Sequence, residues 1–185
     1  MSRPVRVGVI GTGDQGGTLI GALQPDYVQV TAVCDIRPSA IHRAWHGDWL
    51  STAAARLRPG LLSKYGWASE DAARQQVKVF TDYEELLKSE DVEAVVIALP
   101  LHLHHPVALA ALAAGKDVFV ESLFAQTVRQ CKEIARRARQ LQRVCAVGHQ
   151  RHYSVLYQSA GDLIKRNLLG QVCASHAQWH RANAP

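Results

Sequence analysis

Short apolar runs alternate with amphipathic stretches along most of this chain. Runs rich in Val, Ile and Ala occupy residues 5–10, 28–34, 77–80, 92–99, 118–120 and 144–147. They are almost wholly apolar, as strands of a parallel sheet are when helices cover both faces. Helical spacing follows at 18–23, 38–57, 106–114 and 128–141, and a capping pattern of Thr81 and Glu84 precedes Leu86. The chain therefore predicts an α/β fold, a Rossmann doubly wound parallel sheet over residues 1–150.

The last stretch has a different pattern. A further helix is expected over residues 156–168, and residues 172–180 then alternate small or apolar with polar side chains. Such alternation is typical of an antiparallel strand with one solvated face, and a single strand does not stand alone. It either joins an edge of the sheet or begins a second domain. We interpret residues 151–185 as a linking helix and the first strand of a truncated α+β C-terminal domain, whose complete sheet would favour a homo-oligomer.

Charge and composition narrow the classes of partner. The net charge of +5 comes partly from a basic cluster at helical spacing between Arg129 and Arg143. A solvated helix face explains that cluster, and no recognition motif accompanies it, so we expect no nucleic-acid partner. No apolar run approaches the roughly 20 residues of a membrane helix, so we expect no membrane partner. The first residues lead straight into a strand rather than forming a signal peptide.

The cysteines indicate a compartment. Cys34, Cys131, Cys145 and Cys173 are scattered, without the spacing of a metal site. Free thiols are typical of a reducing environment, so the expected location is cytoplasmic. Histidines stand at 102, 104 and 105, but no thiolate or carboxylate lies close to them in sequence. We therefore predict no metal site.

The first chemical signal is a glycine-rich turn. Gly11-Thr12-Gly13-Asp14-Gln15-Gly16 fits the pattern G-x-G-x-x-G, follows a strand and opens a helix. In such a turn the first glycine permits the bend, the second lets a pyrophosphate approach, and the third lets the helix pack on the strand. The helix N-terminus then offers free N–H groups to the phosphates. A plain strand-to-helix turn is the alternative.

An acidic residue follows at the distance that the glycine pattern requires. Asp35 ends the next strand, where a carboxylate can accept hydrogen bonds from an adenosine ribose. A turn-capping Asp is the alternative. Arg37 complicates the choice of cofactor, because a guanidinium attracts a 2′-phosphate that a carboxylate repels. We expect NAD, with NADP as the alternative.

Several residues stand at or just past the carboxyl ends of the expected strands. Gly11, Asp35, Pro100, Glu121 and His149 share this position. In a parallel sheet these ends meet at one rim, where ligands bind. Glu121 is therefore expected at a cofactor crevice, where it could bond a ribose or nicotinamide group. Capping the next helix is its alternative role.

Four segments in order resemble a known family: VRVGVIGTGDQG, VCDIRP, ALPLHLHHPVALAALAAGKDVFVES and VGHQRHYS. The chain is similar to the glucose-fructose oxidoreductase, inositol dehydrogenase and MocA family from about Val5 to Trp179. The resemblance implies an N-terminal Rossmann domain, a C-terminal domain on a large, mostly antiparallel sheet, and a tightly held NAD(P). Most members oxidise or reduce a sugar or related polyol. Some are glycoside hydrolases that use NAD transiently, by oxidation, elimination and re-reduction.

The resemblance also implies site residues. The cofactor-binding candidates are Gly11, Thr12, Gly13, Asp14, Gln15, Gly16, Asp35, Arg37, Leu99, Pro100, His104, Glu121 and Ser122. The glycine turn takes the pyrophosphate, and Asp35 with Arg37 takes the adenosine ribose. Leu99, Pro100 and His104 take the loop beside the nicotinamide ribose, and Glu121 lies near the nicotinamide end. His149 and Arg151 fall where a loop of the family approaches the active site.

Two departures from the family pattern concern catalysis. The family usually follows its Glu with Lys-Pro, and that Lys assists proton transfer; this chain has Ser122 and Leu123. A serine hydroxyl donates a hydrogen bond but does not titrate near pH 7. The sequence also stops at Pro185, just after the first strand of the expected C-terminal domain. We therefore take His149 as the candidate catalytic residue, because histidine is the side chain most often used for proton transfer.

Three functions stay open at this point. The first is the nucleotide-binding portion of an NAD(P)-dependent oxidoreductase that acts on a sugar or polyol. The second is an NAD-dependent glycoside hydrolase of the same fold. The third is an NAD-binding module without catalysis, because the usual Lys is Ser122. Trp45, Trp49 and Trp67 either belong to a packed helix pair or contact a sugar ring.

Overall fold

A computed structural model describes residues 3–178 of the chain, and these fall into two compact units that divide between Gly148 and His149. The strands are β1 (Val5–Ile10), β2 (Val28–Cys34), β3 (Lys78–Phe80), β4 (Ala94–Ile97), β5 (Asp117–Glu121) and β6 (Cys145–Gly148). The helices of the first unit are α1 (Asp14–Ala22), α2 (Pro38–His46), α3 (Thr52–Leu57), α4 (Gly60–Tyr65), α5 (Glu70–Arg74), α6 (Tyr83–Leu87), α7 (Leu101–Ala113) and α8 (Val128–Gln140). The second unit contains α9 (Val155–Lys165).

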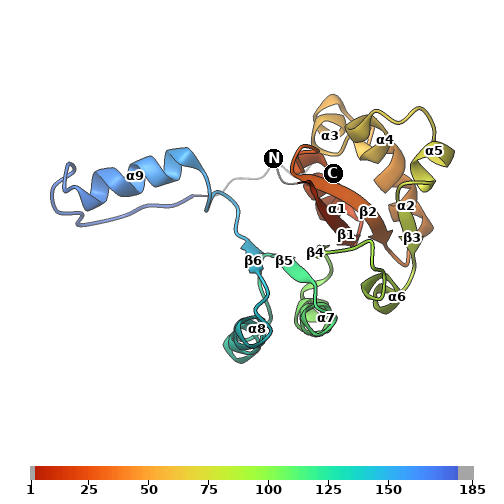
Figure 1. Ribbon diagram of the computed structural model, residues 1–185. Helices are drawn as coiled ribbons and strands as arrows, with labels where there is room; N and C mark the ends of the chain where they lie inside the picture. The colour runs from red at the N-terminus through yellow and green to blue at the C-terminus, as the bar shows by residue number, and fades with distance from the viewer. Residues whose placement is uncertain (1–2, 179–185) are drawn as a thin grey trace. The chain divides into compact units, whose positions relative to one another are not determined.

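The first unit is built on a six-stranded sheet (Figure 1). The strand order is β3-β2-β1-β4-β5-β6, and every neighbouring pair is parallel. The chain starts in the middle at β1, winds out to β3, and returns to β4 on the other side of β1. This reversal between β1 and β4 is the switch point of a doubly wound fold, beside which ligands bind. The predicted Rossmann fold is confirmed.

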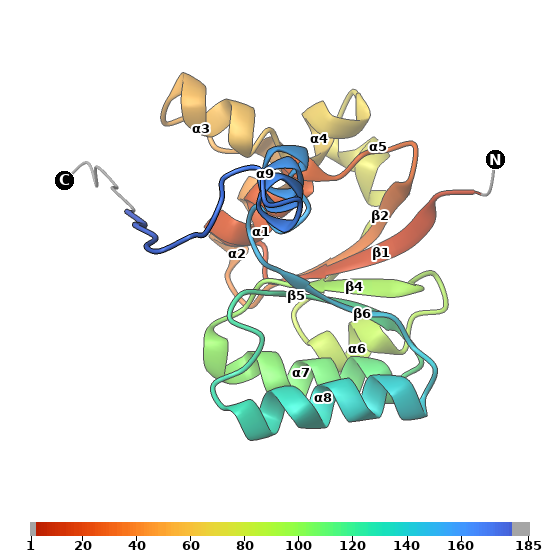
Figure 2. The ribbon, with the colours of Figure 1, turned by 90° about the vertical axis from the view of Figure 1, so that its left-hand side faces the viewer.

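Helices cover both faces of the sheet. Figure 2 shows α6, α7 and α8 along one face and the helices α1 to α5 along the other. Ile20 and Trp45 pack on Val9 and its neighbours in one core. The other core contains Leu112 of α7 and further apolar residues from α6, α8 and the opposite sheet face. Burial on both faces explains why the strands read as continuous apolar runs.

The segment between β2 and β3 differs from the single helix expected over residues 38–57. The helix breaks at Gly47, which has a φ of 82°, and a Cβ there would lie 2.6 Å from the carbonyl oxygen of Arg58. Asp48 is buried behind the break, and its Oδ2 accepts hydrogen bonds from Nε and Nη2 of Arg58 at 3.0 and 2.6 Å. The segment therefore folds into α2, α3, α4 and α5.

The tryptophans of this segment have different environments. Trp45 is fully buried in the core, and Trp67 stacks on Tyr65 with ring centroids 4.8 Å apart. Trp49 is 70% exposed, and its indole N–H donates to the His46 carbonyl oxygen. Trp45 and Trp67 thus pack within the helical segment.

The second unit contains α9 and an extended stretch without regular secondary structure. No residue of α9 is buried, and residues 172–178 form no strand. The strand expected over 172–180 is therefore not formed in its described part, because a strand needs a neighbour to pair its backbone groups. Residues 179 and 180 lie outside the described residues. Between residues 3 and 178, no helix is long and apolar enough to cross a membrane.

Candidate functional site

The turn between β1 and α1 is closed at two of its glycines and open at the third. A Cβ at Gly11 would lie 2.3 Å from the Ala98 carbonyl oxygen, and a Cβ at Gly16 would lie 2.0 Å from that of Gly11. A Cβ at Gly13 would meet only Nη2 of Arg37, at 3.0 Å. Gly13 is therefore the position where something outside the protein can come close to the backbone. This cradle fits a dinucleotide phosphate.

The helix behind this turn begins with free donors. Gly13 is the N-cap of α1 and has no side chain to cap it, and the first N–H groups of a helix have no intrahelical acceptor. The N–H of Gly17 is the first that bonds back, to the Gly13 carbonyl oxygen at 2.8 Å. The positive end of the helix dipole adds to this local preference for an anion.

Asp35 holds the turn in place from β2. Its Oδ2 accepts hydrogen bonds from the backbone N–H of Thr12 at 2.9 Å and from Thr12 Oγ1 at 3.4 Å. Its Oδ1 accepts from the backbone N–H of Arg37 at 2.9 Å. The residue is buried, at 9% exposure. Asp35 thus ties the glycine turn to the loop after β2, a role that the sequence offered only as the alternative.

Arg37 extends across the mouth of the turn. Its Nε lies 3.6 Å from Oδ1 of Asp35, and its side chain is 61% exposed. The guanidinium tip is the only neighbour that a Cβ on Gly13 would touch. Arg37 therefore brings a positive charge to the open position of the turn.

Glu121, at the end of β5, connects this strand to the start of α1. Its Oε1 accepts a hydrogen bond from Nε2 of Gln15, on the first turn of α1, at 2.9 Å. Its Oε2 accepts from the backbone N–H of Ser122 at 2.9 Å. Gly148 at the end of β6 leaves room for the carboxylate, since a Cβ there would lie 3.0 Å from Oε1. The structure thus brings Glu121 to the glycine turn, as its place on the strand rim predicts.

His104 lies beneath the rim rather than on it. The residue is 2% exposed, Nδ1 lies 2.7 Å from the Leu123 carbonyl oxygen, and Nε2 lies 2.8 Å from that of Leu99. Both ring nitrogens therefore face protein backbone, whereas Pro100, the N-cap of α7, is exposed. Sequence reasoning missed the part played by Leu123, because a backbone carbonyl leaves no signature in a sequence.

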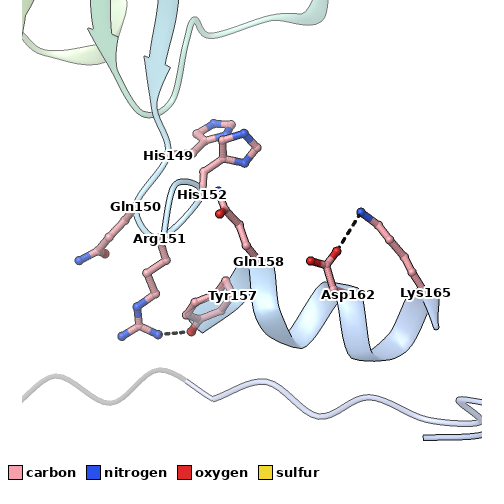
Figure 3. A pocket seen from close by; sticks show the side chains of 9 residues that line it. His149, Gln150, Arg151, His152, Tyr157, Gln158, Asp162 and Lys165 are labelled. Atoms are coloured by element: carbon pink, nitrogen blue, oxygen red, sulfur yellow. Dashed lines mark hydrogen bonds and ion pairs between the residues drawn. The ribbon is translucent and has the colours of Figure 1, made fainter. Parts of the chain in front are cut away.

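His149 follows β6 directly and belongs to the second unit. It lines an open hollow of about 640 Å³ with residues of the loop and of α9 (Figure 3). In that hollow Nη1 of Arg151 donates to the Tyr157 hydroxyl at 2.7 Å, and Lys165 pairs with Asp162 at 3.7 Å. The imidazoles of His149 and His152 lie on the same side of the loop in Figure 3.

Cys34 sits beside Asp35 but faces the core. Burial, together with the negative charges of Asp35 and Asp82, raises the pKa of its thiol to about 12. It is therefore no nucleophile at neutral pH, since only the thiolate reacts. In the described range 3–178, no cluster of three or more His, Cys, Asp or Glu side chains could hold a metal ion.

Comparisons with known proteins agree with this geometry. Residues 5–149 match a family model described as an oxidoreductase family with an NAD-binding Rossmann fold, that of GFO, IDH and MocA. A glycosyl hydrolase family 109 protein of Solibacter usitatus is 30% identical over 177 residues, which are 95% of this chain and 37% of the relative. One of Saccharopolyspora erythraea is 32% identical over 91% of this chain and 33% of the relative. The chain thus spans about a third of these relatives.

Solved structures share the fold. The scyllo-inositol dehydrogenase of Lactobacillus casei, with bound NAD(H) and scyllo-inositol, matches with a TM-score of 0.66 and 19% identity, over 91% of this chain and 43% of that chain. A mutant of KijD10, a 3-ketoreductase of Actinomadura kijaniata, was solved in complex with TDP-benzene and NADP. It matches with a TM-score of 0.67 and 22% identity, over 91% of this chain and 46% of that chain. At these identities the likeness concerns the fold alone.

Proposed function

Because this chain belongs to the glucose-fructose oxidoreductase, inositol dehydrogenase and MocA family of NAD-binding oxidoreductases, we propose that it is the nucleotide-binding portion of an enzyme that moves a hydride between NAD and a carbon of a sugar or polyol. The observation that carries the proposal is the turn that is open only at Gly13. A bound nicotinamide supplies the hydride acceptor and donor of such a reaction.

Different residues at the carboxyl ends of the strands would bind different parts of the cofactor. The N–H groups at the start of α1, next to Gly13, would bind the pyrophosphate. Asp35 has lone pairs left beyond its protein donors, so it would accept from a ribose hydroxyl near its buried carboxylate. Arg37 would lie against the adenosine end, where its charge also tolerates a 2′-phosphate. Leu99, Pro100 and Glu121 would flank the nicotinamide half.

Proton transfer needs a titratable residue, and the position after Glu121 does not supply one. Ser122 is exposed beside Glu121, and its hydroxyl neither carries a charge nor takes up a proton near pH 7. We assign the proton to His149, which follows β6 and carries an exposed imidazole. The test is His149→Gln, which keeps a polar side chain of similar length; it should lower turnover while leaving NAD affinity within about twofold.

Binding of the cofactor is the first test. Isothermal titration of the chain with NAD should give a single site, and Gly13→Val should abolish it because a branched side chain fills the open position. Arg37→Ala should weaken NADP more than NAD, by roughly tenfold for one lost charged contact. Absence of binding heat in the wild-type chain would sink the proposal.

A second candidate function is an NAD-dependent glycoside hydrolase. One observation favours it: the curated relatives above are named glycosyl hydrolases. In such an enzyme one sugar carbon is oxidised, the aglycone leaves by elimination, water adds to the resulting double bond, and the hydride returns to the oxidised carbon, so NAD is not consumed.

One pair of assays separates the candidates. An oxidoreductase should raise the absorbance at 340 nm when NAD and a polyol are supplied. A hydrolase should release nitrophenol from a nitrophenyl glycoside, only in the presence of NAD, with no net change at 340 nm. A chain that binds NAD and does neither, even as Ser122→Lys, would instead be a binding module.

A further inference from the structure

The contacts around the proposed cofactor crevice form a closed circuit. On the exposed side, Gln15 of α1 bonds Glu121 at the end of β5. From Glu121 the chain runs through Ser122 to Leu123, whose carbonyl oxygen lies 2.7 Å from Nδ1 of His104. From His104 the circuit continues to the carbonyl oxygen of Leu99 at 2.8 Å.

The Leu99 loop leads back to the glycine turn. Ala98 donates its N–H to the carbonyl oxygen of Ile10 at 2.9 Å. A Cβ on Gly11 would lie 2.3 Å from the Ala98 carbonyl oxygen and 3.0 Å from Cδ2 of Leu99. The loop after β4 is therefore in close contact with the turn that precedes α1.

We propose that His104 is a positioning residue for the dinucleotide, which holds the loop after β5 against the loop after β4 and so fixes Glu121 at the crevice. We call its two backbone contacts, to Leu99 and Leu123, the His104 clamp. The inference rests on the proposed function, because it assigns the residue a role at that same site. His104 does not touch the cofactor in this arrangement, since it is buried and both of its nitrogens face protein carbonyls.

The chemistry of the ring suits this role. Carbonyl oxygens only accept, and each ring nitrogen of His104 lies within hydrogen-bond distance of one of them, so a ring N–H can be donated to a carbonyl of either loop. An aliphatic side chain would offer no donor to either part-buried carbonyl, so both contacts between the ring and the two loops would be lost. The position in the first turn of α7 fixes the backbone of His104, so the ring is held between the loops rather than free to rotate away.

The two contacts can be removed one at a time. An asparagine amide nitrogen falls near the place of Nδ1, and a glutamine amide nitrogen falls near the place of Nε2. His104→Asn therefore keeps a donor toward Leu123, and His104→Gln keeps one toward Leu99. His104→Leu removes both. The neighbouring His105→Asn is the matched control, because His105 pairs with Glu133 of α8 at 3.0 Å and not with either loop.

The expected result is an order of NAD affinities. His104→Asn should stay within about threefold of wild type, because the loop that carries Glu121 is still held. His104→Gln should lose roughly tenfold, and His104→Leu more, as expected when the contact to Leu123 and then both backbone contacts are lost. His105→Asn should bind as wild type. The Asn and Gln variants should have the same thermal unfolding midpoint. The difference in NAD affinity then reports the position of the Glu121 loop rather than the stability of the fold.

Hydrogen exchange in the NAD-free chain tests the clamp independently. Peptides that cover residues 121–126 should exchange faster in His104→Gln and His104→Leu than in His104→Asn or His105→Asn. Equal exchange and equal affinity of the Asn and Gln variants would overturn the clamp and leave the proposed function standing. A wild-type chain that binds no NAD would defeat the proposed function, while exchange alone would still decide the clamp.

Discussion

A methyl group added at Gly11 or Gly16 collides with backbone, whereas one added at Gly13 meets only the tip of a flexible arginine. Glycine is thus needed for packing at Gly11 and Gly16, and for the approach of a ligand to the backbone at Gly13. The added atom would lie 2.3 and 2.0 Å from fixed backbone oxygens at Gly11 and Gly16, but 3.0 Å from a side-chain nitrogen at Gly13. This difference lets binding and stability be separated by substitution.

Gly13→Ala and Gly16→Ala should therefore fail in different assays. The first should retain the free energy of unfolding within about 0.5 kcal/mol and weaken NAD binding. The second should lower the free energy of unfolding by about 2 kcal/mol or more, because neither backbone can yield without strain. Urea denaturation and NAD titration check both. Equal loss of stability in the two variants would contradict the different contacts of the two glycines.

Cys34 gives a prediction about pH. Burial raises its pKa to about 12, above the value of about 8.5 for an unfolded chain. Between these values the unfolded state has lost the proton that the folded state keeps, so stability present below about pH 8.5 falls as pH rises, by at most about 1.4 kcal/mol per pH unit. Cys34→Ala should lack this contribution. The wild type should therefore lose more stability than the variant between pH 8 and pH 10 in urea titrations.

At the scale of elements, much of the sheet could be predicted because the inner strands β1, β2 and β4 are buried along most of their length and are bounded by polar or glycine residues. The segment after β2 could not, because apolar spacing continues through Gly47 and gives no sign of its left-handed backbone. For the site, the glycine turn and Asp35 follow from spacing. The inward orientation of His104 does not, because it depends on which carbonyls the fold brings near the ring.

Asp48 and Arg58 hold the short helices of that segment together. The backbone N–H of Leu50 and the Arg58 guanidinium keep the pKa of Asp48 below its usual value. Its contribution is therefore present above about pH 4 and is lost as pH falls through the folded pKa. Asp48→Asn should lower the free energy of unfolding by about 1–3 kcal/mol at pH 7. The difference from wild type should shrink toward pH 3, unlike that of the exposed control Asp162→Asn.

For the whole molecule, burial is unevenly shared between the two units. The sheet and its helices contain the cores, whereas α9 contributes no buried residue and leaves Leu156, Leu163 and Ile164 exposed. Stability should therefore reside almost entirely in the first unit. The proposed phosphate cradle lies there too.

A chain ended at Gly148 should accordingly fold. Its free energy of unfolding should stay within about 1 kcal/mol of the full chain, since few buried apolar groups are removed, and its affinity for NAD should be unchanged. Urea titration followed by circular dichroism, and calorimetry with NAD, check this. Loss of folding in the shortened chain would show that α9 contributes more than its exposure suggests.

The polarity of the parallel sheet has a practical consequence. All the groups that we assign to the cofactor follow carboxyl ends of strands, so the opposite rim, at the turns near Tyr27 and Gly115, is remote from them. Fluorescent dyes, affinity tags or inserted peptides attached at those turns should report on the protein without disturbing its cofactor. A biosensor for dinucleotides could be assembled from this chain in that way.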